Sequence, residues 1–308
     1  MIVQVLTDVL VASVALAVPV LVASSGELVG QRAGVLTMSV EGMMLTGAFA
    51  SVIGATTTGS ALAGVLCGAT AGLLFGVLQA LLSVTLRANQ IVTGIAANAL
   101  ALAGTTFGAR LLFERGTAVP GFDRWAVPVL SEIPVVGPAL FRQTPLGYAL
   151  LAAVVVLGIL TSRRTGWGLS IDAVGEDAAA ADRAGIPVLR IRHLAVLGVG
   201  LLSGLAGTQL ALSEVRTFSD NMTAGVGYLA VVAVIAGSWR PVPVVVASLV
   251  FGAAQALQFT LPALGVDVPF ALLVMLPYVL ALVAVAGLVT HSRPPSGLTT
   301  TFARVRAA

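Results

Sequence analysis

The stretch Gly64-Val-Leu-Cys-Gly-Ala-Thr-Ala-Gly-Leu-Leu-Phe-Gly76 places a glycine at every fourth residue of an apolar run. Residues four apart share one face of an α-helix, so these glycines predict a groove that lets a neighbouring backbone approach closely. The whole run, residues 61–86, is near the roughly 20 residues that a helix needs to cross a hydrocarbon core. A later run has a similar glycine spacing, with Gly200, Gly204 and Gly207. The chain therefore contains membrane helices that pack tightly.

Comparable apolar runs recur along all 308 residues, and they lack the two-residue alternation of barrel strands. Apolar residues make up 58% of the chain and charged residues 9%. Soluble domains carry about 25% charged residues. We expect an all-α, polytopic membrane helix bundle of about nine (eight to ten) transmembrane helices. The expected spans are residues 3–22, 35–55, 61–86, 91–113, 146–161, 193–212, 222–238, 242–261 and 268–289.

Arginine supplies all 16 basic residues, and its distribution predicts the topology. Positive residues collect on the cytoplasmic side, which places residues 162–192 and the basic C-terminus inside and the N-terminus outside. The expected organisation is one transmembrane domain, residues 1–291, and a disordered cytoplasmic tail, residues 292–308. Within the domain, residues 113–145 form an extracytoplasmic loop and residues 162–192 a cytoplasmic loop. The formal charge of +3 reflects this topology and does not predict nucleic-acid binding.

Several kinds of site are missing from the sequence. A phosphate-binding P-loop needs a lysine, and the chain has none, so it does not carry its own ATPase of that type. No Ser/His/Asp or paired-carboxylate constellation predicts enzyme chemistry. No Cys/His/Asp cluster has the spacing of metal ligands. We expect no catalytic residue, no metal and no cofactor bound by this chain.

The longest charged loop contains a short predicted helix within Asp172-Ala-Val-Gly-Glu-Asp-Ala-Ala-Ala-Ala-Asp-Arg-Ala-Gly-Ile186. Asp177 can cap its start, alanines continue it, and Gly185 can close it in a left-handed turn. Because charged residues are so few in this chain, a short, rigid helix that carries several of them indicates a docking site for a partner. We interpret the stub as the contact through which a separate motor protein drives a transporter.

Two spans begin with an irregular, glycine-flanked segment. Residues 34–42 open the second span and residues 221–228 open the seventh. Short or interrupted helices at corresponding places in two halves of a chain indicate the binding region of a transporter. In the expected topology the second span runs outward and the seventh inward, as in an inverted repeat. The similarity between the two segments is too faint to establish a repeat.

Glu41 is the only carboxylate expected well inside a span, where it costs roughly 3 kcal/mol on insertion scales. Three interpretations stay open: backbone N–H groups near a helix start satisfy it, it contacts the solute, or it pairs with Arg32 or Arg87. Other embedded polar residues serve either as interhelical hydrogen bonds or as solute contacts. Together they favour a neutral, hydrogen-bonding small molecule. The candidate pathway residues are Glu41, Thr93, Asn98, Gln209, Asn221, Gln255 and Gln258.

The run Gly34-Val-Leu-Thr-Met-Ser-Val-Glu-Gly-Met-Met-Leu-Thr-Gly-Ala48 resembles the signature of ABC-transporter permeases of the branched-chain amino acid and ribose type. Three further motifs resemble the nucleoside-type members that work with basic-membrane-protein lipoprotein receptors. These are Arg87-Ala-Asn-Gln-Ile-Val-Thr-Gly94, the Gly-Glu-Asp…Ala-Gly-Ile186 loop and Phe218-Ser-Asp-Asn-Met-Thr-Ala-Gly225. The similarity extends from about residue 15 to residue 293.

The resemblance implies a pore subunit in the cytoplasmic (inner) membrane that forms a heterodimer with a second, homologous permease. It also implies cytoplasmic ABC ATPases that bind ATP-Mg and an extracytoplasmic substrate-binding lipoprotein. By position, the stub matches the family's coupling helix, although the family often has Asn-Pro where Asp177 and Ala178 stand. The coupling residues implied are Gly175, Glu176, Asp177, Asp182, Arg183 and Gly185.

We therefore expect the permease subunit of an ATP-driven importer that moves nucleosides by alternating access. The same machinery importing sugars or branched-chain amino acids is an alternative within the family. An ion-coupled secondary transporter is a second alternative, but such proteins bury several charged residues and only Glu41 qualifies. A structural membrane subunit without a transport path is a third.

Overall fold

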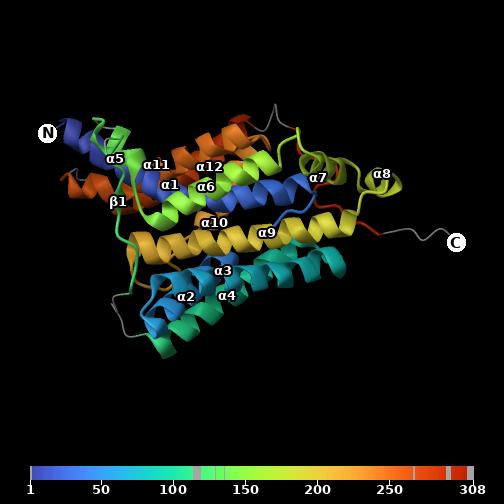
Figure 1. Cartoon of the computed structure of the whole chain (residues 1–308), viewed down its shortest axis with the longest axis horizontal. Coiled ribbons are helices and arrows are strands. Elements are labelled where there is room, and N and C mark those ends of the chain that lie inside the picture. The colour runs from blue at the N-terminus through green and yellow to red at the C-terminus, as the bar shows by residue number, and fades with distance from the viewer. Residues whose placement is uncertain are drawn as a thin grey trace.

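The computed structural model describes residues 2–113, 119–128, 130–134, 136–265, 268–288 and 293–303. These residues are almost wholly helical, and the long helices lie side by side along one axis (Figure 1). The α-helices are α1 (Ile2–Arg32), α2 (Val40–Thr58), α3 (Ala61–Ala80), α4 (Gln90–Leu112), α5 (Val136–Phe141), α6 (Pro145–Leu160), α7 (Gly166–Glu176), α8 (Ala178–Arg183), α9 (Val188–Gln209), α10 (Val226–Ala236), α11 (Pro241–Ala263) and α12 (Phe270–Leu288). The π-helical segments Leu81–Thr85 and Leu210–Val215 continue α3 and α9. A 3-10 turn covers Leu130–Glu132, and the short strands β1 (Trp125–Ala126) and β2 (Arg142–Gln143) pair antiparallel.

The all-α class is confirmed, but the count of about nine spans is not. Every apolar run predicted as a span contains a helix. Among the described residues, however, only α1, α3, α4, α9, α11 and α12 are long and apolar enough to cross a membrane. The helices α6 and α10 are apolar but shorter. With 11 residues, α10 reaches about 16 Å, roughly half of a 30 Å hydrocarbon core.

The two ends of the bundle differ in what they carry (Figure 1). The helices α7 and α8 and the C-terminal residues lie at one end, here called the α8 end. The N-terminus, α5 and β1 lie at the other, here called the α5 end. At the α5 end the described loop residues pack onto the end of α9, where the Phe122 N–H donates to the Leu212 carbonyl at 3.1 Å.

Glycines hold α2, α3 and α9 in backbone contact, as the four-residue repeat predicts. Gly64, Gly68, Gly72 and Gly76 are all buried along one face of α3. A methyl group on Gly72 would lie 2.4 Å from the carbonyl oxygen of Gly200 in α9. One on Gly207 would lie 1.9 Å from the carbonyl oxygen of Met44 in α2. Side chains at these positions would force the three helices apart.

Two elements differ from their predicted bounds. The first helix continues to Arg32, well past the predicted end at residue 22, so its charged and amide residues lie inside a helix. The predicted loop at residues 162–192 holds a complete helix, α7, before α8 begins. This helix has an apolar face, with Ile171 and Val174 buried, which the mixed composition of the loop conceals.

The described part of the C-terminal tail is ordered, although we expected the segment from residue 292 to be disordered. The Gly297 N–H donates to the Gly175 carbonyl at 2.8 Å, and Phe302 packs against the cluster formed by Ile171, Val174 and their neighbours. The prolines and glycine that suggested disorder belong to a turned segment over the end of α7, residues 293–303, here called the strap. Residues 304–308 lie outside the described part.

The glycine contacts give a test of the packing. We expect Gly72→Ala to lower the melting temperature of the detergent-solubilised protein, because the new methyl group meets the Gly200 backbone. Overpacking of this kind costs about 1–3 kcal/mol. Gly158→Ala in α6 is the matched control, since nothing lies within 4 Å of its new methyl group. Equal melting temperatures for the two variants would contradict the close approach of α3 and α9.

Candidate functional site

The two interrupted segments predicted from the sequence meet at Glu41. Its Oε1 accepts hydrogen bonds from the Thr223 hydroxyl at 2.6 Å and the Gly225 N–H at 2.8 Å. Its Oε2 accepts one from the Gly227 N–H at 2.7 Å. The carboxylate in the first turn of α2 therefore caps the start of α10. Of the three interpretations, the structure shows satisfaction by backbone N–H groups, supplied by α10.

Asn98 ties α4 to both segments. Its Oδ1 accepts a hydrogen bond from the Gly42 N–H at 2.8 Å. Its Nδ2 donates to the Met38 carbonyl and to the Tyr228 hydroxyl, both at 2.8 Å. One buried amide thus fixes the irregular segment before α2 against the first turn of α10. We call Glu41, Asn98, Thr223–Gly227 and Tyr228 the Glu41 junction.

Glycines let these backbones come together. A methyl group on Gly227 would lie 2.5 Å from the Cα of Glu41, and one on Gly94 would lie 2.5 Å from the Cβ of Met38. Gly225 has a φ of +87°, a left-handed conformation that glycine adopts without strain. These close approaches and the left-handed turn explain why glycine stands at positions 94, 225 and 227.

Two partly exposed side chains at the junction are tyrosines. The positive end of the α10 dipole is already matched by the Glu41 carboxylate, so it does not call for an anionic solute. Tyr228 and Tyr278 are each 38% exposed, and the Tyr278 hydroxyl donates to the Ala224 carbonyl beside α10. Two partly exposed phenol rings flank one helix start and suit a planar, neutral molecule.

Two other pathway candidates lie on the elements of the junction. Asn221 is exposed in the irregular segment before α10 and has a φ of +55°. Thr93 lies on α4, where its hydroxyl donates to the Asn89 carbonyl of its own helix at 2.9 Å. Neither side chain makes a hydrogen bond to Glu41 within the described ranges.

The remaining candidates lie elsewhere. Gln209 forms a separate buried cluster on α9, where its Nε2 donates to the Thr144 hydroxyl at 3.2 Å and its Oε1 accepts from the Ser213 hydroxyl at 3.0 Å. Gln255 and Gln258 lie on α11, and the Gln255 Nε2 is buried without a hydrogen-bond partner among the described residues. Across all the residues that the structure describes, no group of three or more His, Cys, Asp or Glu side chains could hold a metal ion.

Glu27 is a buried carboxylate that the sequence analysis missed. Its Oε1 accepts hydrogen bonds from the Thr37 N–H at 3.0 Å and the Gln31 amide at 2.9 Å. The Gln31 Oε1 in turn accepts from the indole N–H of Trp239 at 2.7 Å. The predicted end of the first span at residue 22 left Glu27 outside. Glu27 and Gln31 are four residues apart, a spacing at which side chains interact along one face of a helix. This spacing could have indicated that the helix continues past residue 22.

The predicted docking stub is present at the α8 end. The Asp177 carboxylate accepts hydrogen bonds from the N–H groups of Ala179 and Ala180, both at 2.9 Å, and so caps α8. Gly185 ends the element with a φ of +85°. Arg183 is exposed in the last turn of α8. The stub thus has the local structure that its sequence predicts.

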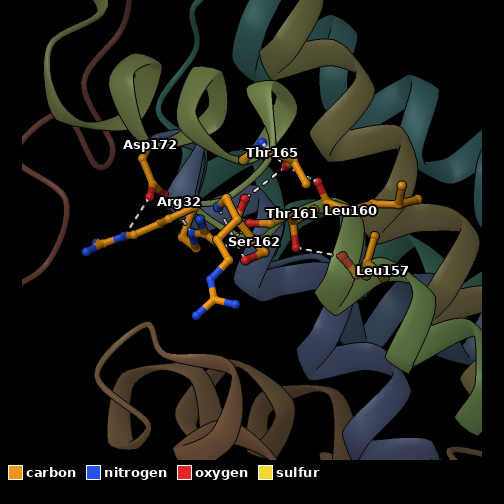
Figure 2. Close-up of polar contacts among 10 residues, drawn as sticks. Arg32, Leu157, Leu160, Thr161, Ser162, Thr165 and Asp172 are labelled. Carbon is orange, nitrogen blue, oxygen red and sulfur yellow. Dashed lines mark hydrogen bonds and ion pairs between the residues drawn. The ribbon is translucent and has the colours of Figure 1, made fainter.

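An ion-pair cluster fixes α7 to α1 (Figure 2). The Arg32 Nε donates to Asp172 Oδ1 at 2.7 Å, and Arg32 Nη1 donates to the Thr161 carbonyl at 3.0 Å. Arg163 reaches the other oxygen of Asp172 at 3.0 Å. The partner of Arg32 is therefore Asp172 rather than Glu41. Arg32 is buried, at 6% exposed, whereas the Asp172 side chain is 25% exposed, so the pair lies at the edge of the protein interior.

The C-terminal strap joins the base of α8 to the segment that leads to Glu41. The Gly175 carbonyl accepts from Gly297 N–H at 2.8 Å, and the Gly34 carbonyl accepts from Thr299 N–H at 3.2 Å. The Glu176 carboxylate accepts from the Ser296 hydroxyl at 2.7 Å. Of the predicted coupling residues, Gly175 and Glu176 thus contact the strap, which the sequence alone did not indicate.

Comparison with known families identifies the chain. Residues 9–286 match the family described as the permease component of the branched-chain amino acid transport system. The chain belongs to this family. It is therefore a multi-pass membrane transport subunit, consistent with its six long apolar helices among the described residues.

Named relatives of this permease cover most of its length. It is 32% identical to the guanosine ABC transporter permease protein NupQ of Bacillus subtilis, over 96% of each chain. It is 34% identical to the nucleoside ABC transporter permease protein NupC of Lactococcus lactis subsp. cremoris, over 87% of this chain and 88% of the other. It is 37% identical to the putative glucose ABC transporter permease protein TsgC13 of Haloferax volcanii, over 80% and 75%. No solved structure gives a significant match.

The Glu41 junction can be tested in this permease by one isosteric change. In Glu41→Gln the side-chain amide turns a donor toward the Gly227 or Gly225 N–H, so one hydrogen bond is replaced by repulsion. Hydrogen bonds to a charged group contribute about 1.5–3 kcal/mol. We expect a lower melting temperature and a strong loss of solute uptake, measured per inserted molecule. Glu132→Gln, in an exposed turn, is the control. Normal uptake by Glu41→Gln would contradict the junction.

Proposed function

We propose that this permease is one subunit of an ATP-driven ABC importer that carries nucleosides through the cytoplasmic membrane. The observation that supports this most directly is the Glu41 junction, where two interrupted helices meet within a family of transport permeases. Such breaks line solute sites in transporters, because irregular backbone is tolerated at membrane depth only within protein or beside a cavity. The guanosine and nucleoside names of the two long relatives supply the solute class.

The chemistry of the junction suits a nucleoside. A nucleoside is neutral, and its planar base can stack on aromatic rings while its ribose and base edges form hydrogen bonds. Tyr228 and Tyr278 provide rings and hydroxyls beside the start of α10. Sugar import is the second candidate, favoured by the putative glucose permease among the relatives.

We further propose that α8 docks a cytoplasmic ATPase and that the movement passes through the strap. Docking would displace α8 and the end of α7, to which Gly175 belongs. Gly175 is in van der Waals contact with the Arg32 backbone, and the strap links it to Gly34. From Gly34 the chain runs directly into the segment that ends at Glu41. This route requires the α8 end and the C-terminus to be cytoplasmic.

The proposed partners complete the importer. A second, homologous permease would share the solute path as the other half of a heterodimer. An extracytoplasmic lipoprotein would deliver the solute at the α5 end, and ATP-Mg would bind only to the ATPase subunits. About nine membrane spans, including the shorter α6 and α10, fit this arrangement because a partner subunit covers the polar backbone that short helices leave at their ends.

Uptake into proteoliposomes tests the function. With the ATPase subunits, second permease and lipoprotein present, we expect ATP-dependent accumulation of radiolabelled guanosine that survives collapse of ion gradients. Unlabelled adenosine should compete and glucose should not. Uptake abolished by ionophores would establish a secondary transporter instead. Accumulation of radiolabelled glucose in place of guanosine would establish the sugar importer.

Truncation tests the strap. Removal of residues 296–308 deletes the donors to Gly175 and Gly34 and also Thr300, whose carbonyl binds the buried Arg192 at 2.8 Å. We expect uptake to fall several-fold while ATP hydrolysis by the partner subunits continues, because the mechanical link is cut. Removal of residues 304–308 alone is the control and should leave uptake unchanged. If both truncations transport normally, the strap has no part in coupling.

A further inference from the structure

An apolar cavity of about 270 Å³ lies between α1, α6, α7 and α9 at the α8 end. Its walls include Leu157, Leu160, Leu194 and Gly198. The Thr161 hydroxyl also lines it but donates to the Leu157 carbonyl of its own helix at 2.7 Å, so the cavity gains no free polar group from it (Figure 2). The cavity is close in size to the roughly 300–1,000 Å³ of small-molecule sites. It is separate from the Glu41 junction.

The cavity is open on one side, where several of its lining side chains are exposed. Leu160 is 56% exposed, Trp167 58% and Leu194 49%, although all three line it. In a membrane protein such side chains face hydrocarbon or a partner. Gly198 has open space beside it, since nothing lies within 4 Å of a methyl group built there. Trp167 at the rim is the residue type that gathers at membrane–water interfaces.

Two arginines lie close in the chain to residues that line the cavity. Arg164 follows Thr161 in the turn between α6 and α7, and Arg190 lies one helical turn before Leu194 on the same face of α9. Both are exposed, and neither has an ion-pair partner among the described residues. The nearby Asp172 is already paired with Arg32 and Arg163. The local charge is therefore positive.

We propose that this cavity binds one acyl chain of an anionic phospholipid, whose phosphate lies on Arg164 and Arg190. An apolar slot beneath unpaired cations matches a molecule with a hydrocarbon tail and an anionic head. A zwitterionic lipid would fill the slot with less charge complementarity. Because α7 leads directly into α8, the bound lipid would contact the element that we propose to couple to the ATPase. The proposal does not depend on which solute is carried.

Quenching of Trp167 by brominated lipid tests the site in the assembled transporter. The Trp167 signal is the difference in fluorescence between the wild-type complex and the same complex with Trp167→Phe. Vesicles of phosphatidylcholine receive increasing fractions of brominated phosphatidylglycerol or brominated phosphatidylcholine. We expect half-maximal quenching at an about fivefold lower fraction of phosphatidylglycerol, since each arginine near an anionic head group favours binding.

Matched variants separate the head group from the chain. Arg164→Gln with Arg190→Gln should remove the preference for phosphatidylglycerol, whereas Arg240→Gln, also exposed, should keep it. Gly198→Leu should fill the cavity and weaken quenching by phosphatidylglycerol. Gly104→Leu on α4, also open around its new side chain, should not.

Three results would overturn the proposal. Equal quenching by the two brominated lipids in the wild-type complex would show ordinary bilayer contact. A preference that survives both the arginine and the Gly198→Leu changes would place the lipid elsewhere. Absence of quenching by either lipid would show that a partner protein covers this face. Because the readout is fluorescence, failure of the importer assay would leave this result independent.

Discussion

The structure depends on one constraint: backbone polar groups inside a membrane need partners within the protein. Two helices break this regularity, because α2 and α10 both begin after irregular segments. The Glu41 carboxylate resolves the conflict by accepting from Thr223, Gly225 and Gly227 at the start of α10. An intramembrane charge that would be costly alone thus becomes the cap of a half-length helix. The break and the charge stabilise each other, and it is beside this break that we propose the solute path.

Close backbone contact makes this arrangement possible. Glycines on α3 and α9 remove the side chains that would separate them, and glycines at the Glu41 junction do the same for α2, α4 and α10. Without a hydrophobic driving force between helices in lipid, such contacts and a few hydrogen bonds supply the association energy. Asn98 is the clearest example, since one amide joins three segments. A bundle held in this way can rearrange as rigid groups of helices rather than deform continuously.

The α8 end is held by an ion pair in addition to close backbone contacts. Arg32 and Asp172 fix α7 to α1, and the strap closes over Gly175 and Gly34. Few residues therefore separate α8, where we propose that the ATPase docks, from the segment that ends at Glu41. The apolar cavity that we propose as a lipid site is lined in part by residues of the same two helices, α1 and α7.

The sequence by itself determined the helical class, the positions of the apolar helices, the glycine grooves and the cap of α8. These follow from local periodicity and local hydrogen bonding, which a single segment specifies. Tertiary structure decided which partners the buried polar groups find: Glu41 with α10, Arg32 with Asp172, and Glu27 inside an α1 longer than predicted. It also ordered the strap, which hydrogen-bonds to Gly175 in α7, to Gly34 just after α1 and to Arg192 in α9. Gln209, Gln255 and Gln258 are, like Asn98, amides within apolar runs. Only the packing of the helices shows that Asn98 belongs to the junction and that the three glutamines do not. Such pairings join residues far apart in the chain, so no local pattern specifies them.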